Sequence, residues 1–361
     1  MSKNLFTKVF FSILLCLFFI NVQSQSLGRE KYKELTNNDF VEQIDLVSKP
    51  FEIGSGKLIS PLRIIPVNNY LVIHDLESKK HLHVIDIAQK KYMGSYIDIG
   101  SGSNEMSNIS VLEESGKDSF IIWDGYNKKY LYSKIEYLLN SATNFVSGTL
   151  DEKGYFYFLN YYEEVNKLWY AGHFNEGYRL YQKDIKSGKV KKYGKLLSAA
   201  KGKLNTIEVK NHLSAAKIEK GNNHIVFAYE TVPLLEVFDQ NTKEFISVFI
   251  PHSEPPIYYA VQEQQKVEIG STNGSLYEFL DVKLTDKYIY AVYRGEEFTN
   301  TDPIKSVVYV FDYNLKPIKL YYLDKEVTSI AVYNDEIMYG LNIAPLIPGQ
   351  KGKLLKYDLR K

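Results

Sequence analysis

Six apolar segments of similar build recur along the 361-residue chain, and this repeat restricts the possible fold more than any other feature. A turn-rich cluster of Asn, Asp, Gly or Lys precedes each segment, and a second apolar run precedes the cluster. Two short β-rich runs joined by such residues are typical of a β-hairpin. The segments begin 49, 48, 57, 63 and 49 residues apart. They are Leu71–Asp75, Phe120–Asp124, Leu168–Gly172, Ile225–Tyr229, Tyr288–Val292 and Ile337–Leu341.

A third run follows each hairpin and often ends on an acid that opens a turn. An Asp side chain accepts bonds from backbone N–H groups two residues ahead, so this acid is a structural signature. The second unit departs from the pattern, with Glu136 where the others have Asp. The acids are Asp86, Asp184, Asp239, Asp312 and Asp358, and a Lys or Gly follows four of them at the fourth position: Lys90, Gly188, Lys243 and Lys316.

Six units of roughly 50 residues, each with three or four strands, predict an all-β fold, a six-bladed β-propeller. A pair of β-sandwiches is the alternative, but its strands would not come in sets of four at this spacing. One domain is expected over 25–361, with blades at about 58–105, 106–153, 154–205, 206–265, 276–325 and 326–361. The last unit lacks a fourth strand, so the strand-like run at about 40–47 is expected to pair with 354–358 and close the ring.

The two long steps of the repeat predict insertions. Residues 189–220 are rich in Lys, Ala and Leu and are interpreted as an insertion between the third and fourth blades, with room for a short helix. Residues 251–270 are interpreted as a second excursion on the surface.

The first 24 residues have the build of a secretory signal. Lys3 and Lys8 precede the apolar run Val9–Val22, and Ser24 is a plausible cleavage point. The apolar run is shorter than the roughly 20 residues of a membrane span, and an uncleaved anchor is the alternative. Cys16 is a candidate for lipidation, although the bulky Leu15 is a poor residue for a lipobox. The protein is therefore expected to be exported, in the periplasm, at the outer membrane or secreted, and membrane-bound only if a lipid anchors it.

Composition and motifs exclude several classes of function. Lys and Arg total 44 against 43 for Asp and Glu. The chain therefore lacks the net basic charge that would favour a nucleic-acid partner. The sequence contains no nucleophile elbow, zinc-protease motif, P-loop or calcium loop. Cys16 is the only cysteine, so a chain cleaved after Ser24 has no disulfide and no thiol nucleophile.

At this level the sequence resembles the TolB-like six-bladed propeller lipoproteins of Bacteroidetes. Three stretches carry the resemblance: Pro61–Asp75 leading to Gly100–Glu105, Tyr288–Gly295, and Val310–Pro317 with the following Leu323 and Asp324. The likeness covers most of residues 50–361. It implies the fold and a place in the cell envelope, and it specifies no reaction. Ser103 stands where family members usually have Pro, and the poor lipobox departs from the family's lipid anchor.

Propeller geometry suggests where a ligand would bind. Loops that enter each innermost strand, and loops that join the second and third strands, crowd one face, where they can vary without disturbing the blades. The loops in question are 100–105, 172–177, 294–305 and 342–352. Their polar side chains can bind a polar ligand and a tyrosine can stack on one, although Arg294 and Glu105 can equally pair with neighbouring loops. The candidate ligand-binding residues are Arg294, Glu296, Tyr293, His173, Asn104 and Glu105.

Two other patterns have a structural interpretation beside the functional one. His81 and His83 lie on one face of a strand and could hold a metal, but no third ligand is near, which favours solvated histidines at a loop end. Gly100–Glu105 looks like a phosphate cradle, but no helix follows it, which favours a tight turn between blades.

The sequence thus predicts an exported, monomeric, non-enzymatic binding or scaffolding module without a cofactor. Its partner is expected to be an envelope protein, a glycan or a peptide. The alternative is a propeller hydrolase or lyase with a divalent cation on the axis, held by Asp, Glu, Asn or His from several blades. A purely structural protein is the third possibility. No residue is assigned a catalytic role.

Overall fold

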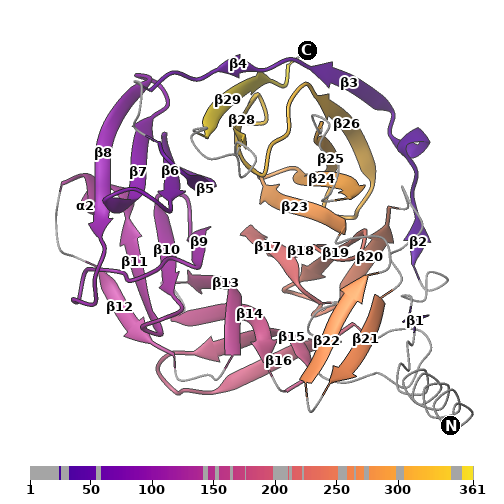
Figure 1. The fold of residues 1–361 in the computed structure, drawn as a ribbon, viewed down its shortest axis with the longest axis horizontal. Helices are drawn as coiled ribbons and strands as arrows, with labels where there is room; N and C mark the ends of the chain where they lie inside the picture. Colours follow the sequence, from indigo (N-terminus) through magenta and orange to yellow (C-terminus); the bar gives the residue numbers. More distant parts are fainter. Residues whose placement is uncertain are drawn as a thin grey trace, which may run out of the picture.

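The computed structural model is a ring of six β-sheets around a central axis, which confirms the predicted six-bladed β-propeller (Figure 1). The structure describes residues 24–25, 32–53, 58–140, 145–150, 154–162, 166–174, 176–197, 210, 214–221, 223–250, 258–263, 266–271, 276–297, 305–342 and 352–360. The predicted signal segment with Cys16 lies outside these residues, apart from β1 (Ser24–Gln25).

Each blade is an antiparallel sheet that runs outward from the axis in sequence order. Blade 1 has β5 (Pro61–Val67), β6 (Tyr70–Asp75), β7 (Lys80–Asp86) and β8 (Lys91–Asp98). Blade 2 has β9 (Val111–Glu114), β10 (Ser119–Asp124), β11 (Lys129–Lys134) and β12 (Val146–Thr149). Blade 3 has β13 (Gly154–Tyr162), β14 (Lys167–Phe174), β15 (Tyr178–Asp184) and β16 (Val190–Lys195).

The other three blades receive additional strands from the N-terminal segment. Blade 4 has β17 (Ala216–Gly221), β18 (His224–Tyr229), β19 (Leu234–Asp239) and β20 (Phe245–Phe249). Blade 5 has β23 (Leu276–Leu284), β24 (Ile289–Glu297), β25 (Val307–Phe311) and β26 (Pro317–Leu323). Blade 6 has β27 (Ser329–Tyr333), β28 (Ile337–Asn342) and β29 (Lys353–Asp358). A hairpin, β21 (Tyr258–Glu263) and β22 (Lys266–Ser271), lies between blades 4 and 5 in sequence and pairs with β1.

Local chemistry explains why the sequence turns where it does. Asn68, Asn166 and Asn334 have positive φ angles in the turns between first and second strands, a conformation that Asn tolerates better than most residues. The acids that end the third strands accept backbone N–H groups, as Asp239 does from Asn241 and Thr242. These bonds lower the pKa of Asp239. The residues at positive φ that follow include Lys90, Gly188 and Lys243, but in blade 5 this residue is Leu315 and not Lys316.

The N-terminal segment closes the ring along the outer edges of three blades, and we call residues 32–51 the belt (Figure 1). Within it, β2 (Lys33–Glu34) pairs parallel with β20, and β3 (Glu42–Leu46) pairs parallel with β26. The fourth strand of blade 6 is β4 (Lys49–Pro50), which pairs with Leu355 and Lys356. An N-terminal strand therefore completes the last blade as predicted, but the run 40–47 does not: most of it extends blade 5, one blade earlier.

Of the two predicted insertions, the first differs from expectation, whereas the second contains the hairpin of β21 and β22. Residues 190–195 form β16, the outer strand of blade 3, and residues 216–220 belong to β17, so an insertion between these blades is shorter than predicted. The short helix expected there falls largely outside the described residues. Helical segments elsewhere are α2 (Ile135–Leu139), where blade 2 lacks the turn-opening Asp, and η2 (Asn37–Asp39) in the belt.

The hydrophobic core consists of layers between neighbouring blades. Ile65, Val84, Leu112 and Ile122, for example, pack together where blades 1 and 2 meet.

His81 and His83 are buried in β7, which corrects the expectation that they are solvated. The His81 ring is hydrogen-bonded to the Met106 carbonyl at 2.8 Å, and the His83 ring to the Tyr92 hydroxyl at 2.8 Å.

Candidate functional site

The ring has two ends that differ in their connections. At one end, which we call the loop side, second strands lead into third strands and each blade leads into the next. At the other end, the turn side, tight turns join the first and second strands of each blade. All six residues predicted to bind a ligand belong to the loop side.

The structure places the predicted residues apart from one another. Arg294, near the end of β24, lies 3.6 Å from a Glu326 carboxylate oxygen, so it pairs with a neighbouring segment as the structural interpretation held. His173 ends β14 in a different blade, beside the Tyr157 ring. Tyr293 is buried between Phe279 and Tyr309.

Tyr293 therefore contradicts the expectation that it stacks on a ligand. Its hydroxyl donates to Glu278 at 2.6 Å, and burial, followed by the charge of Glu278, raises the pKa of Tyr293 well above its usual range. The backbone of Glu296 extends β24, but its side chain lies outside the described residues, as do the loops 298–304 and 343–351.

The loop 100–105 is the tight turn that the sequence favoured over a phosphate cradle. The Glu105 carboxylate accepts the Gly102 N–H at 2.9 Å, and the Gly102 N–H would be needed by a bound anion. Asn104 is half-buried in the same turn. Glu105 thus holds its own loop together.

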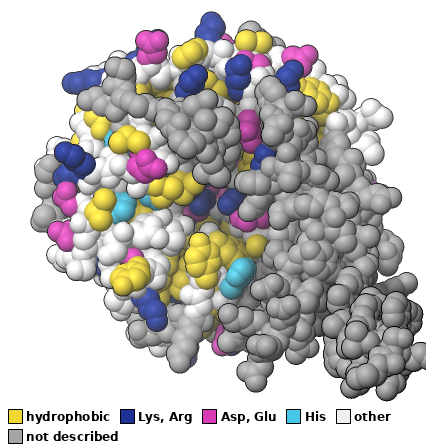
Figure 2. All heavy atoms as spheres, in the orientation of Figure 1, with side chains coloured by type: hydrophobic (Ala, Val, Ile, Leu, Met, Phe, Trp, Pro, Cys, Tyr) yellow, Lys and Arg dark blue, Asp and Glu magenta, His cyan; other side chains and the backbone are white. Residues whose placement is uncertain are grey.

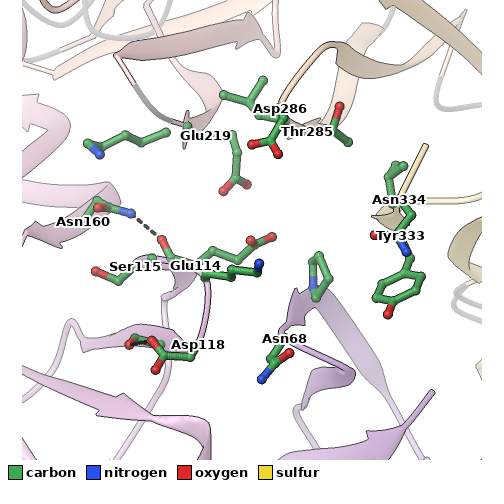
Figure 3. Close-up of a pocket in the computed structure, with 18 of the residues that line it drawn as sticks. Asn68, Glu114, Ser115, Asp118, Asn160, Glu219, Thr285, Asp286, Tyr333 and Asn334 are labelled. Atoms are coloured by element: carbon green, nitrogen blue, oxygen red, sulfur yellow. Dashed lines mark hydrogen bonds between the residues drawn. The ribbon is translucent and has the colours of Figure 1, made fainter. Parts of the chain in front are cut away.

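A cavity of about 1060 Å³ opens on the turn side of the ring, at the axis (Figure 3). Such a volume is sufficient for a ligand of several sugar units or amino-acid residues. All six blades contribute to its lining, with amide, carboxylate and ammonium groups predominant. Residues that represent each blade in turn are Asn69, Lys117, Asn160, Glu219, Asp286 and Asn334.

Hydrogen bonds between neighbouring blades fix the rim of this cavity. The Asn68 N–H donates to the Lys117 carbonyl at 2.9 Å and joins blades 1 and 2. The Tyr333 hydroxyl donates to Asn69 at 2.7 Å and joins blades 6 and 1. The Tyr290 hydroxyl donates to Asp335 at 3.0 Å and joins blades 5 and 6. Because the rim is held in this way, the cavity is largely preformed.

Two glutamates from different blades point into the cavity (Figure 3). Glu114 ends β9 in blade 2, and its carbonyl accepts a bond from the buried Asn160 amide of blade 3. Glu219 lies on β17 in blade 4 and accepts a bond from Lys283 at 2.7 Å. Burial, and then the charge of Glu219, raises the pKa of Glu114 well above its usual range, against the opposing effect of Lys283.

Charged side chains continue along the axis from this floor. Lys283 lies 3.7 Å from Asp281, whose other oxygen accepts the Ser329 hydroxyl at 2.8 Å. Arg63 forms an ion pair with the buried Glu113. Burial acts to lower the pKa of Lys283, but the charges of Asp281 and Glu219 raise it above its usual value. Figure 2 shows basic and acidic side chains together near the middle of the visible face. Across the part of the chain that the structure describes, no three His, Cys, Asp or Glu side chains gather as a metal ion would require.

From the sequence, the turns of this rim were interpreted only as hairpin turns between strands. One signal could have revealed the site: charged residues occur within the innermost strands, as Glu113-Glu114, Glu219-Lys220 and Asp281 with Lys283. Charged groups in strands that face the axis are expensive to bury unless they are paired or functional. The cavity was missed because convergence across blades is invisible in one unit of the repeat.

A closed ring of six sheets defines the protein as a six-bladed β-propeller, and a polar cavity lies on its axis. The chain belongs to the TolB-like 6-blade propeller-like family, which its residues 39–335 match. Among known proteins whose functions are curated, none matches the sequence.

Two crystal structures from Bacteroides have a similar fold. A Bacteroides fragilis protein described as exported has a TM-score of 0.54 at 11% identity, with 91% of this chain and 100% of that chain covered. A member of the DUF4221 family from Bacteroides vulgatus has a TM-score of 0.53 at 10% identity, with 87% and 95% covered. At these identities the likeness establishes the fold alone. No helix within the described ranges is long and apolar enough to cross a membrane.

Proposed function

We propose that this protein is an exported binding module that holds a polar ligand, a glycan or a peptide, in the cavity on the turn side of its ring. The observation that carries the proposal is the cavity itself, which all six blades line with polar groups. A preformed hollow with convergent polar side chains is the usual form of a binding site. The signal-like N-terminus supports export, and the exported relative from Bacteroides fragilis is in keeping with it.

This proposal moves the site from the loop side, where the sequence suggested it, to the turn side. The family resemblance does not decide between the two ends, because its motifs describe strands and turns. The described loop-side residues are engaged with their own surroundings: Arg294 with Glu326, Glu105 with Gly102, and Tyr293 with Glu278. The turn-side cavity instead offers polar groups to a space that is large enough for a ligand.

A pair of matched variants tests the location. Lys117 is exposed on the rim of the cavity, and Lys79 is exposed on the loop side of blade 1. The mature chain is first screened against soluble oligosaccharides and oligopeptides by isothermal titration calorimetry. We expect Lys117→Trp to weaken the binding of a hit about tenfold or more, because the indole fills part of the cavity mouth, whereas Lys79→Trp leaves it unchanged.

Two outcomes would overturn the proposal. If Lys79→Trp weakens binding and Lys117→Trp does not, the loop side is the binding face. If turnover of the hit is observed and a chelator abolishes it, the protein is instead the hydrolase or lyase with an axial divalent cation.

A further inference from the structure

The floor of the cavity has an unusual arrangement of charge. Glu114 and Glu219 line the cavity from blades 2 and 4, the two blades that flank blade 3, so the ring brings both carboxyl groups to the same space (Figure 3). Glu219 is 2% exposed, and Glu114 is half-buried. Two carboxylates in a poorly hydrated space repel each other, and burial penalises both charges.

The cations of the axis do not neutralise this pair. Lys283 bonds to Glu219 but also lies 3.7 Å from Asp281, so its charge serves two acids. Arg63 pairs with Glu113. Burial lowers the pKa of Lys220 to about 8, against the effect of Glu219, so Lys220 is still mostly charged at neutral pH. On the axis, the three cations Lys283, Arg63 and Lys220 thus accompany four carboxyl groups: Glu113, Glu114, Glu219 and Asp281.

We infer that the cavity binds a ligand that carries a primary ammonium group, and that this group lies between Glu114 and Glu219. An ammonium has three N–H donors and can bond to both carboxyl groups at once. An anionic group at the same place would meet two acids. The amides of the rim, such as Asn68 and Asn334, can then bond to the hydroxyl or amide groups of the remainder of the ligand (Figure 3).

Two natural sources have this chemistry: an amino sugar and a lysine-bearing peptide. Each offers a matched neutral probe, since acetylation removes the charge and leaves the skeleton. The probes are chitosan tetramer and its fully N-acetylated form, and the N-terminally acetylated peptide acetyl-Gly-Lys-Gly and its Nε-acetylated form. Affinities are measured by calorimetry with the mature chain at neutral pH.

This inference rests on the binding site proposed above, and the experiment separates the two. We expect the ammonium form of at least one pair to bind about tenfold more tightly than its acetylated form. Preference within the sugar pair identifies an amino sugar, and preference within the peptide pair identifies a peptide. Equal binding of charged and acetylated forms overturns the ammonium inference and leaves the cavity as a site. Binding of none of the four counts against both.

Variants locate the charge that is responsible. Glu114→Gln keeps the shape of the side chain and should reduce the preference for the ammonium form to less than about threefold. Glu105→Gln removes a carboxylate on the loop side and should leave the preference intact. Glu219→Gln is less informative, because it leaves Lys283 without a buried partner and threatens the fold. A preference that survives Glu114→Gln and disappears in Glu105→Gln would overturn the inference.

Discussion

Blades 4, 5 and 6 are built differently from blades 1, 2 and 3, although all six share one repeat. The outer edges of blades 4 to 6 are covered by the belt, with β2, β3 and β4 added one to each blade. The sheets of blades 1 to 3 have four strands each, all supplied by their own unit of the repeat. The chain thus closes its ring through three contacts spread over half the circumference.

The belt is fastened by buried side chains as well as by strand pairing. Leu35 and Phe40 pack where blades 4 and 5 meet. Leu46 packs with blades 5 and 6, and Phe51 packs with blades 6 and 1. Each anchor therefore lies at a junction between two blades, which means that the belt holds blades to each other.

Of the changes considered, removal of the belt should lower the stability of the ring most. Deletion of residues 26–50 removes three of the four anchors, Leu35, Phe40 and Leu46. Their burial contributes roughly 1.5–3 kcal/mol each, a sum comparable with the whole stability of a typical domain. A chain that lacks residues 26–50 should therefore lose cooperative unfolding, monitored by circular dichroism during thermal and urea denaturation. A chain that lacks only residues 26–31 is the control and should unfold as the full chain does.

Hydrogen exchange on the same deletion sharpens the result. If the belt closes the ring, amide protection should fall in blades 1 to 3 as well as in blades 4 to 6. Loss of protection confined to blades 4 to 6 would show that the belt only covers its own blades, and the idea of distributed closure would be wrong.

Two groups of buried ion pairs near the axis should contribute differently to stability: Lys283 with Glu219 and Asp281, and Arg63 with Glu113. In blade 5, Lys283→Met leaves the buried Glu219 and Asp281 without their cation, and we expect a loss of about 3–5 kcal/mol in the free energy of unfolding. In blade 1, the Arg63 side chain is 17% exposed, and burial raises the pKa of its partner Glu113, which can take up a proton. Arg63→Met should therefore cost less, about 1–3 kcal/mol.

Urea denaturation of the two variants provides the comparison, with both slopes inspected for a change in the denatured state. A larger loss for Arg63→Met than for Lys283→Met would contradict the prediction that the Arg63–Glu113 pair contributes less to stability.

Much of this architecture could be predicted because the repeat is local. Each hairpin turn and each turn-opening Asp depends on residues within about five positions. The sequence of a single unit is therefore sufficient to predict the strands and turns of its blade. The belt could not be placed as well, because the alternating pattern of residues 40–47 fits any sheet edge of the ring. Pairing with blade 5 and pairing with blade 6 differ only in long-range packing, such as Phe40 against Tyr309.

The cavity was harder to predict for a related reason. Glu114 and Glu219 are more than a hundred residues apart, and only closure of the ring brings them to one space. The loop-side residues were selected in the sequence because their loops are expected to crowd one face of the propeller. In the structure, Arg294, Glu105 and Tyr293 serve the fold, which shows that polar residues on that face are weak evidence for a site.

Blade 1 should also make the ring sensitive to acid. Burial, and then the neighbouring His81, lowers the pKa of His74 to about 4 from its usual 6.5. The neutral imidazole is favoured in the folded state, so its contribution is complete above pH 6.5 and is lost as the pH falls toward 4. The shift corresponds to about 3 kcal/mol. His74→Gln should reduce the difference in stability between pH 7 and pH 4.5 by about 2 kcal/mol, since pH 4.5 is still above the folded-state pKa.

The half-exposed His224 in blade 4 is the matched control, since its ring lies against Tyr313 near the surface. His224→Gln should change the free energy of unfolding less than His74→Gln does, because its side chain is 25% exposed whereas His74 is 2% exposed. An equal effect of both substitutions would mean that acid acts on the ring as a whole and that blade 1 is not its sensitive part.

The smallest expected effect concerns an ion pair between β3 and blade 5, Glu42 with Lys319 at 2.8 Å. Both side chains are in contact with water, at 52% and 29% exposure, and such pairs contribute little because solvent screens them. Glu42→Gln should lower the free energy of unfolding by less than about 0.5 kcal/mol. Phe40→Ala, a few residues away, should lower it by about 3–5 kcal/mol, because the Phe40 ring packs against Tyr309 and Phe311. The ratio between these two losses, measured by urea denaturation, reports how the belt is held. A large loss in Glu42→Gln would mean that charge at the outer edge, and not burial at the junction between blades, keeps the ring closed.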